Sequence, residues 1–159
     1  CALPISDILR RPLDAAERAT LGIRYGQLVR DAVLACPLVD GAAELLASVH
    51  GRVPLFVASA TPEAELVDIL TRRRLAGYFD RVFGHPTSKA DAVRAAQAAT
   101  GVPMEAIVFV GDARSDYDAA LAAGCRFIGR QAPEGGAPFS GTGVPVVTDC
   151  RQIMEWWKA

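Results

Sequence analysis

The sequence predicts an α/β fold, a Rossmann-like three-layer arrangement in which helices cover both faces of a parallel sheet. Two short runs, residues 53–58 and 106–110, are almost wholly apolar, which is typical of strands buried on both faces. From residue 53 onward, strand and helix patterns alternate at spacings that favour parallel βαβ units with right-handed crossovers. With 51% apolar and 22% charged residues, the composition is that of a globular domain rather than a disordered chain.

The first 36 residues have a helical pattern and contain no candidate strand. Ile5, Ile8 and Leu9 recur at helical spacing until Pro12 interrupts the pattern. A longer helix, capped by Asp14, is expected to run to about residue 35. This segment is therefore interpreted as a helical appendage in front of the sheet.

Proline residues mark the next boundaries. After the break at Pro37, we expect Asp40 to cap a helix that continues through Val49. Beyond the apolar run at 53–58, Thr61 is the expected cap of a helix that ends near residue 74. Pro62 then stands at the first helical position, where its missing N–H costs nothing.

In the second half of the chain, cap residues locate two helices. Ser88 is the expected cap of a helix to about Thr100, with Asp91 placed as in a capping box. Gly124 is expected to end a helix at residues 116–123. The remaining expected elements are strands at residues 81–83, 126–128 and 145–147 and a closing helix at residues 150–158.

Charge and cysteine content exclude several classes of partner. The formal net charge is −1, so neither nucleic acid nor a membrane surface is an expected partner. The apolar runs are far shorter than a bilayer span, and no signal peptide is visible. The four cysteines, at positions 1, 36, 125 and 150, are too scattered for a thiolate metal site. Reduced thiols in a cytoplasmic protein are the expectation.

Two carboxylates stand in the turn that joins the second apolar strand to its helix. Asp112 and Asp116 are four residues apart in the phrase Gly-Asp-Ala-Arg-Ser-Asp. Mg²⁺ prefers carboxylate and water oxygens, so this turn is a candidate metal site with one direct ligand and a second one that acts through water. The alternative is structural, with Asp116 as a helix cap and Asp112 as a solvated loop residue.

Two further residues are candidate anion-binding groups. Lys89 begins a helix, where the partial positive charge disfavours a cation, so it is expected to face a phosphate or a neighbouring aspartate. A solvated surface lysine is the alternative. Ser59 follows the first apolar run, and its hydroxyl together with adjacent backbone N–H groups, including that of Ala60, can hold a phosphate oxygen.

Taken together, the order and phrasing of these residues resemble the haloacid dehalogenase superfamily, in particular its phosphoglycolate-phosphatase-like members. Ser59, Lys89 and the Asp112–Asp116 turn match the superfamily's second, third and fourth motifs. The resemblance covers about residues 37–150, and residues 1–36 look like the last helices of a small cap. It therefore implies two domains, a cap remnant at 1–36 and a core at 37–159 that lacks its first strand.

The resemblance also implies a function. Ser59 would hydrogen-bond the transferring phosphoryl group, Lys89 would neutralise its charge, and Asp112 and Asp116 would hold Mg²⁺. The implied activity is Mg²⁺-dependent hydrolysis of a small phosphorylated metabolite, with Ser59 and Lys89 as catalytic residues and Ser59, Ala60 and Lys89 in contact with substrate.

One part of the family pattern is missing. The superfamily's nucleophile segment, an aspartate with a second aspartate two residues on, has no counterpart here, because residues 38–41 lack the first aspartate and a strand. In the family this segment precedes the cap, so an aspartyl-phosphate would form on a residue upstream of this sequence. The alternative is a catalytically inactive domain that serves as a binding or assembly module.

Overall fold

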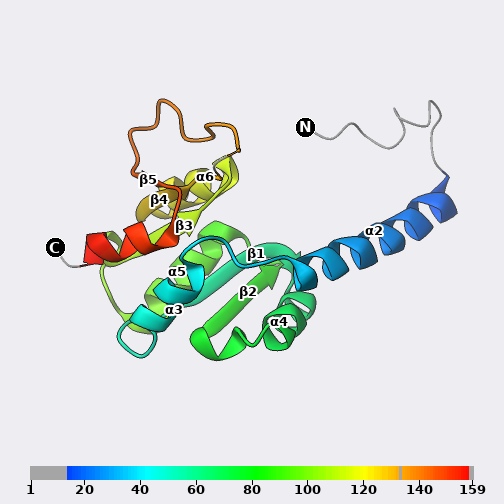
Figure 1. Cartoon of the computed structure of the whole chain (residues 1–159), viewed down its shortest axis with the longest axis horizontal. Helices are drawn as coiled ribbons and strands as arrows, with labels where there is room; N and C mark the ends of the chain where they lie inside the picture. The colour runs from blue at the N-terminus through cyan, green and yellow to red at the C-terminus, as the bar shows by residue number, and fades with distance from the viewer. Residues whose placement is uncertain (1–13, 133, 158–159) are drawn as a thin grey trace. The chain divides into compact units, whose positions relative to one another are not determined.

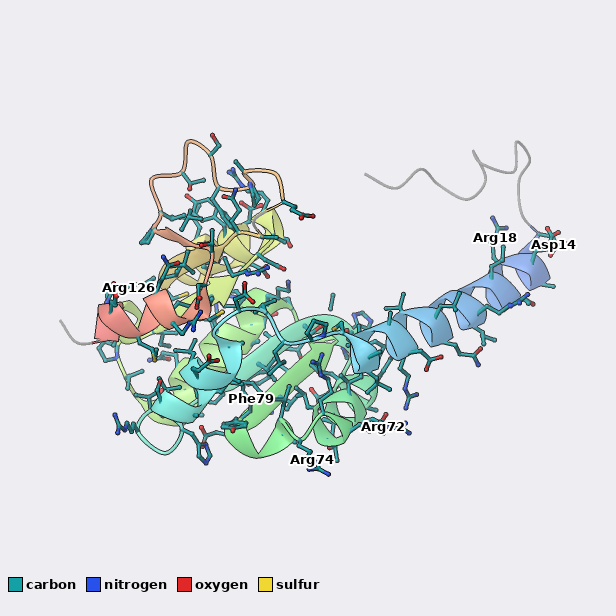
Figure 2. The ribbon with its side chains drawn as sticks, in the orientation of Figure 1. Asp14, Arg18, Arg72, Arg74, Phe79 and Arg126 are labelled. Atoms are coloured by element: carbon teal, nitrogen blue, oxygen red, sulfur yellow. The ribbon has the colours of Figure 1, made fainter. Side chains whose placement is uncertain are left out.

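The computed structural model describes residues 14–132 and 134–157, and the chain divides into two compact units, Cys1–Cys36 and Pro37–Ala159 (Figure 1). In the first unit, helix α2 spans Ala15–Ala35, with Asp14 at its start (Figure 2). The Asp14 carboxylate accepts from the Glu17 N–H at 2.8 Å, and the Glu17 carboxylate accepts from the Asp14 N–H at 3.0 Å. The predicted cap and helix end are confirmed, whereas the pattern expected around Pro12 lies outside the described residues.

The second unit alternates strands with helices, and every pair of neighbouring strands is parallel, as the sequence predicted. Its strands are β1 (Phe56–Pro62), β2 (Arg81–His85), β3 (Val108–Gly111), β4 (Arg126–Arg130) and β5 (Val146–Val147). Its α-helices are α3 (Ala42–Val49), α4 (Glu63–Arg72), α5 (Lys89–Thr100) and α6 (Arg114–Ala123). Short 3₁₀ helices lie at η1 (Ala76–Tyr78), η2 (Met104–Ala106) and η3 (Cys150–Trp157).

The strands form two separate sheets rather than one. β1 pairs with β2 in the first sheet, and β4 lies between β3 and β5 in the second (Figure 1). Among the described residues, β1 and β3 each have a strand partner on one side only. The α/β class is therefore as predicted, with its parallel sheet in two parts.

The core of the second sheet lies on both of its faces. Ile128, Val147, Cys150 and Ile153 are buried in one cluster, against which the partly buried Leu45 of α3 packs. The second cluster contains Ala120 of α6 and the rings of Phe127 and Phe139. Helix α6 and the η3–α3 pair thus cover the second sheet.

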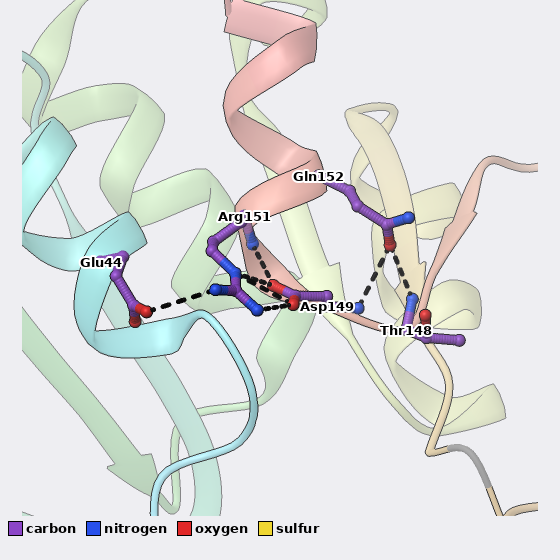
Figure 3. Close-up of polar contacts among 5 residues, drawn as sticks. All are labelled: Glu44, Thr148, Asp149, Arg151 and Gln152. Atoms are coloured by element: carbon purple, nitrogen blue, oxygen red, sulfur yellow. Dashed lines mark hydrogen bonds and ion pairs between the residues drawn. The ribbon is translucent and has the colours of Figure 1, made fainter.

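A polar network joins α3 to η3 (Figure 3). The Asp149 carboxylate accepts from the Arg151 backbone N–H at 2.8 Å and also contacts the Arg151 guanidinium. That guanidinium reaches Glu44 of α3, with 3.8 Å between Nη1 and Oε1. The Gln152 side chain accepts from the backbone N–H groups of Thr148 and Asp149 at 3.0 and 3.2 Å, so the turn entering η3 is fixed.

Two predicted helix caps are wrong. Gly41, not Asp40, stands at the N-cap of α3, with a left-handed φ of 74° and no side-chain cap. The Asp40 carbonyl accepts from the Cys150 N–H at 2.8 Å, and a Cβ at Gly41 would collide with Asp149. Thr61 does not cap α4 either, because β1 continues to Pro62, which occupies the N-cap position.

One other prediction concerns the thiols. Cys36, Cys125 and Cys150 are free thiols, and burial raises the pKa of both Cys125 and Cys150. Arg72, at the end of α4, pairs with Asp68 of the same helix at 3.0 Å. Within the described part of the chain, no helix combines the length and apolar character that crossing a membrane requires.

Candidate active site

The site is built at the carboxyl ends of the strands, and Ser59 lies at the end of the first sheet. β1 and β2 are in regular register from Phe56 to Ala58, after which the register shifts before Pro62 meets His85. Ser59 is therefore part of β1, at an irregularity, rather than after the strand as expected. Irregularities of this kind re-aim side chains and are frequent beside active sites.

The Ser59 hydroxyl is engaged within its own turn. Its Oγ donates to Thr61 Oγ1 at 3.0 Å and accepts from the Thr61 backbone N–H at 3.1 Å. Ser59 is half-buried, whereas Ala60 is exposed. The turn thus holds the hydroxyl in one place next to the exposed backbone of Ala60.

Lys89 is the first residue of α5, as predicted. Ser88 caps the helix, its Oγ accepting from the Asp91 N–H at 3.1 Å. The Ser88 hydroxyl, helped by Arg94, lowers the pKa of Asp91 below its usual range. The Lys89 side chain is 25% exposed, and its Nζ donates to Oδ1 of Asp116. Of the two anions considered for Lys89, the structure thus shows the neighbouring aspartate.

Asp116 is held more tightly than a surface carboxylate. Its side chain is 6% exposed, and Oδ2 accepts from the Ala113 N–H at 3.0 Å at the start of α6. Gly111 makes this placement possible, because a Cβ at Gly111 would overlap the Asp116 side chain. Asp116 therefore links the end of β3, the start of α6 and Lys89.

The Lys89–Asp116 ion pair connects the carboxyl end of the first sheet to the carboxyl end of the second. Lys89 follows β2, whose residue His85 lies in register with Pro62 of β1, close to Ser59. Asp116 lies in the first turn of α6, which follows β3 through the short turn that contains Asp112. Because strands within each sheet are parallel, their carboxyl ends lie at one edge. Ser59, Lys89 and Asp112 therefore share one rim of the second unit.

The acidic residues of this rim fit part of a metal site. Asp112 is exposed at the end of β3, while Asp116 is occupied by Lys89 and Ala113. No group of three or more His, Cys, Asp or Glu side chains suited to a metal occurs in the described ranges, 14–132 and 134–157. Asp112 can bind a hard cation directly, but a complete carboxylate set for Mg²⁺ needs a further ligand.

Sequence reasoning missed Arg130, which ends β4 at the same rim. Arg130 follows Gly129, and Gly129 lies in register with Gly111, the residue before Asp112. Its Nε is buried and has no hydrogen-bond partner within the described residues. The sequence signal for Arg130 is its position at the end of an apolar strand. An arginine in that position is often a surface residue, so the position alone does not identify a residue of the site.

Comparisons with known proteins identify relatives of this arrangement. A family model described as haloacid dehalogenase-like hydrolase matches residues 6–130. A predicted phosphoglycolate phosphatase from Haemophilus somnus superposes with a TM-score of 0.79 at 21% identity, covering 96% of this chain and 72% of that one. A haloacid dehalogenase-like protein of unknown function from Agrobacterium tumefaciens gives 0.76 at 20% identity, covering 97% and 73%.

The matched structures are longer than this chain. A predicted phosphatase from Clostridium acetobutylicum is 24% identical, with a TM-score of 0.63, and the match covers 75% of this chain but 59% of that one. The likeness at these identities shows a shared fold. No curated protein sequence matches the chain significantly.

Proposed function

This chain belongs to the haloacid dehalogenase-like hydrolase family, and on that premise we propose that it is part of a Mg²⁺-dependent phosphatase that hydrolyses a small phosphorylated metabolite. The observation that carries the proposal is the Lys89–Asp116 ion pair, which stands beside Asp112 at the rim. A phosphoryl group needs concentrated positive charge and a metal ligand at one place, and this rim offers both.

Each rim residue has a role that its contacts permit. The Lys89 ammonium has three N–H donors, so it can give one to Asp116 and keep others for a phosphate oxygen. Ser59 Oγ and the backbone N–H of exposed Ala60 would bind a second oxygen. Positioning and charge neutralisation supply most of the catalysis in phosphoryl transfer, and these side chains supply both.

Two carboxylates of the rim would hold the metal. Asp112 would ligate Mg²⁺ directly, and Asp116, already bound to Lys89 and Ala113, would ligate it directly or through water. Bound Mg²⁺ neutralises charge on the phosphate. The further carboxylate would come from an aspartate upstream of this sequence, which would also be the nucleophile and form the aspartyl-phosphate.

Replacing Asp112 tests the proposal in the protein extended upstream of Cys1. We expect Asp112→Asn to lower Mg²⁺-dependent hydrolysis of p-nitrophenyl phosphate by about 100-fold or more, because an amide is a poor Mg²⁺ ligand. Asp118→Asn is the matched control, since Asp118 lies on α6, the helix that follows Asp112, in an exposed pair with Arg114. Unchanged turnover in Asp112→Asn would remove Asp112 from the site.

The same assay separates the enzyme from its alternative. If the extended wild-type protein hydrolyses no phosphate monoester with Mg²⁺ present, the phosphatase proposal fails. The domain would then be a binding or assembly module with an inactive rim.

A further inference from the structure

A buried arginine nitrogen at the rim lacks a partner. Arg130 is the last residue of β4 and is half-buried, and its Nε is buried without a hydrogen bond to any described residue. The carboxylates of residues 14–132 and 134–157 form no ion pair with it either. A buried donor without a partner is destabilising, so an arginine in this state needs an explanation in terms of function.

Two glycines show which face of the second sheet Arg130 occupies. Gly111 and Gly129 are in register, and a Cβ on either would collide with a side chain on the α6 face of the sheet. The side chain that Gly111 would meet is that of Asp116, and Gly129 would meet Phe139. Because side chains alternate along a strand, Arg130 points to the opposite face, which η3 covers.

The acids on that face leave Arg130 without a counter-ion. Burial raises the pKa of the Cys150 thiol in η3, and the Arg130 charge opposes that rise. Asp149 and Asp40 also act on this thiol, so both acids lie in the same region. Asp149 is bonded to Arg151 instead (Figure 3), and within the described ranges neither acid pairs with Arg130. The guanidinium is thus available to an anion from elsewhere.

The spacing of the strands gives the distance from Arg130 to the candidate phosphate position. Asp112 follows Gly111, the register partner of Gly129, so Asp112 and Arg130 lie at the ends of adjoining strands. A phosphate held between Lys89 and Asp112 would lie one to two strand spacings, about 5–10 Å, from Arg130.

We propose that Arg130 binds a second anionic group of the substrate, a carboxylate or a second phosphate, about 5–10 Å from the phosphorus of the ester. The inference rests on the proposed function and narrows its substrate to doubly anionic phosphate monoesters. Since Arg130 ends its strand and is not fully buried, an anion at the rim can reach its guanidinium.

A guanidinium suits this role because of its fixed geometry. Nε and one Nη donate in parallel to two oxygens of the same anion, which satisfies the buried Nε and neutralises the charge together. A water molecule satisfies the donor but leaves the charge unpaired. A substrate without the second anion would do the same, so Arg130 discriminates against it.

Matched substrates test the proposal in the protein extended upstream of Cys1. 6-Phosphogluconate and glucitol 6-phosphate share a carbon chain and differ at its far end, where one has a carboxylate and the other an alcohol. Fructose 1,6-bisphosphate and fructose 6-phosphate are the corresponding pair for a second phosphate. In one pair we expect a kcat/KM roughly tenfold or more higher for the doubly anionic member, mainly through a lower KM. That pair identifies the anion, and no preference in either pair would overturn the inference.

Variants locate the preference at Arg130. Arg130→Met removes the charge and should reduce the preference by roughly tenfold or more, while Arg130→Lys keeps the charge without the fork and should recover only part of it. Arg126→Met is the matched control and should keep the preference, because Arg126 is exposed on the same face of β4 at the other end of the strand. If Arg130→Met lowers kcat/KM equally for both members of the pair, Arg130 does not recognise the second anion and the inference fails.

Thermal melting without substrate separates recognition from a structural role. Arg130→Met removes a buried donor that has no partner in the described chain, so we expect its melting temperature to equal or exceed that of wild type. A clearly lower melting temperature would show that the fold itself needs the guanidinium and would contradict the proposal.

Binding measurements separate this inference from the proposed function. If the extended protein hydrolyses none of the four esters, calorimetry with Mg²⁺ present measures their binding directly. Tighter binding of a doubly anionic ester by wild type, but not by Arg130→Met, would then support the inference and contradict the proposed function. Hydrolysis without a preference in either pair would overturn this inference alone, and equal binding without hydrolysis would overturn both.

Discussion

At the scale of single residues, the rim depends on one buried carboxylate. Asp116 is the buried charged residue of the described chain, at 4% exposure, and it accepts from both Lys89 and the Ala113 N–H. A buried carboxylate without partners would be strongly destabilising, so these contacts are what allow it to lie there. Two substitutions test this, one steric and one electrostatic.

Gly111→Ala tests the steric requirement. A Cβ at Gly111 would overlap the Asp116 side chain, so the carboxylate or the end of β3 has to move. We expect the free energy of unfolding, from urea denaturation, to fall by about 1–3 kcal/mol. Gly136→Ala is the control, because its Cβ would meet no atom within 4 Å, and it should change little. Equal effects of the two substitutions would contradict the close packing.

Lys89→Met tests the charge requirement. It leaves Asp116 buried without its cation, and we expect the free energy of unfolding to fall by about 1.5–3 kcal/mol. Asp116→Asn should recover part of this loss when added to Lys89→Met, because a neutral amide is cheaper to bury. Strictly additive urea-denaturation results across this double-mutant cycle would show that the two side chains are not coupled.

At the scale of elements, the turn entering η3 makes a prediction about pH. The hydrogen bonds from Arg151 lower the pKa of Asp149 below its ordinary 3.8. A carboxylate with a lowered folded-state pKa stabilises the protein above its unfolded-state pKa, and that contribution is lost as the pH falls through the folded-state value. The stability difference between wild type and Asp149→Asn should therefore be present at pH 7 and disappear in acid.

Urea denaturation of both proteins from pH 7 down to pH 2 measures this difference. Asp118→Asn, in an exposed pair with Arg114, is the control for a general loss of negative charge. A difference between wild type and Asp149→Asn that persists unchanged at pH 2 would rule out the Asp149 carboxylate as its source.

Local sequence patterns predicted most elements and failed where a distant contact decides the boundary. Three caps are as predicted: α2 begins after Asp14, α5 begins after Ser88, and α6 ends before Gly124. These predictions succeed because capping depends on residues within one helical turn. Asp40 fails as a cap because Gly41 packs against Asp149, more than a hundred residues later, and turns the chain through a left-handed conformation. A pattern of residues within one helical turn cannot predict a contact between residues so far apart in the sequence.

Helix α2 makes a prediction that depends on local structure alone. Gly22 and Gly26 lie inside the helix, and a Cβ at either position would meet no atom within 4 Å. Replacing both with alanine should stabilise α2 by about 0.5–1 kcal/mol per site, because glycine loses more backbone entropy. Gly124→Ala, at a φ of 81°, should instead lower the melting temperature. Far-ultraviolet circular dichroism during melting distinguishes these outcomes.

At the scale of the whole molecule, the sequence indicated the direction of every strand pair but not which side chains meet. The apolar runs and their spacing predicted parallel βαβ units, and the cations and acids at strand ends marked a candidate rim. The contact between Lys89 and Asp116 joins elements 27 residues apart and depends on how α5 and α6 pack, which periodicity does not encode. The irregularity at Ser59 likewise requires the register with β2.

The split sheet predicts an uneven pattern of amide hydrogen exchange in the 159-residue chain. β4 has strand partners on both sides, so the amides of Ile128, on the β3 side, and Gly129, which donates to the Pro145 carbonyl beside β5, should exchange slowest. In β1 and β3, successive N–H groups point to opposite edges, and those on the edge away from the paired strand have no strand acceptor within the described residues. Their exchange should therefore alternate between slow and fast along each strand. Exchange measured residue by residue by NMR tests this, and uniform protection of β3 at the level of β4 would mean that its free edge is already covered.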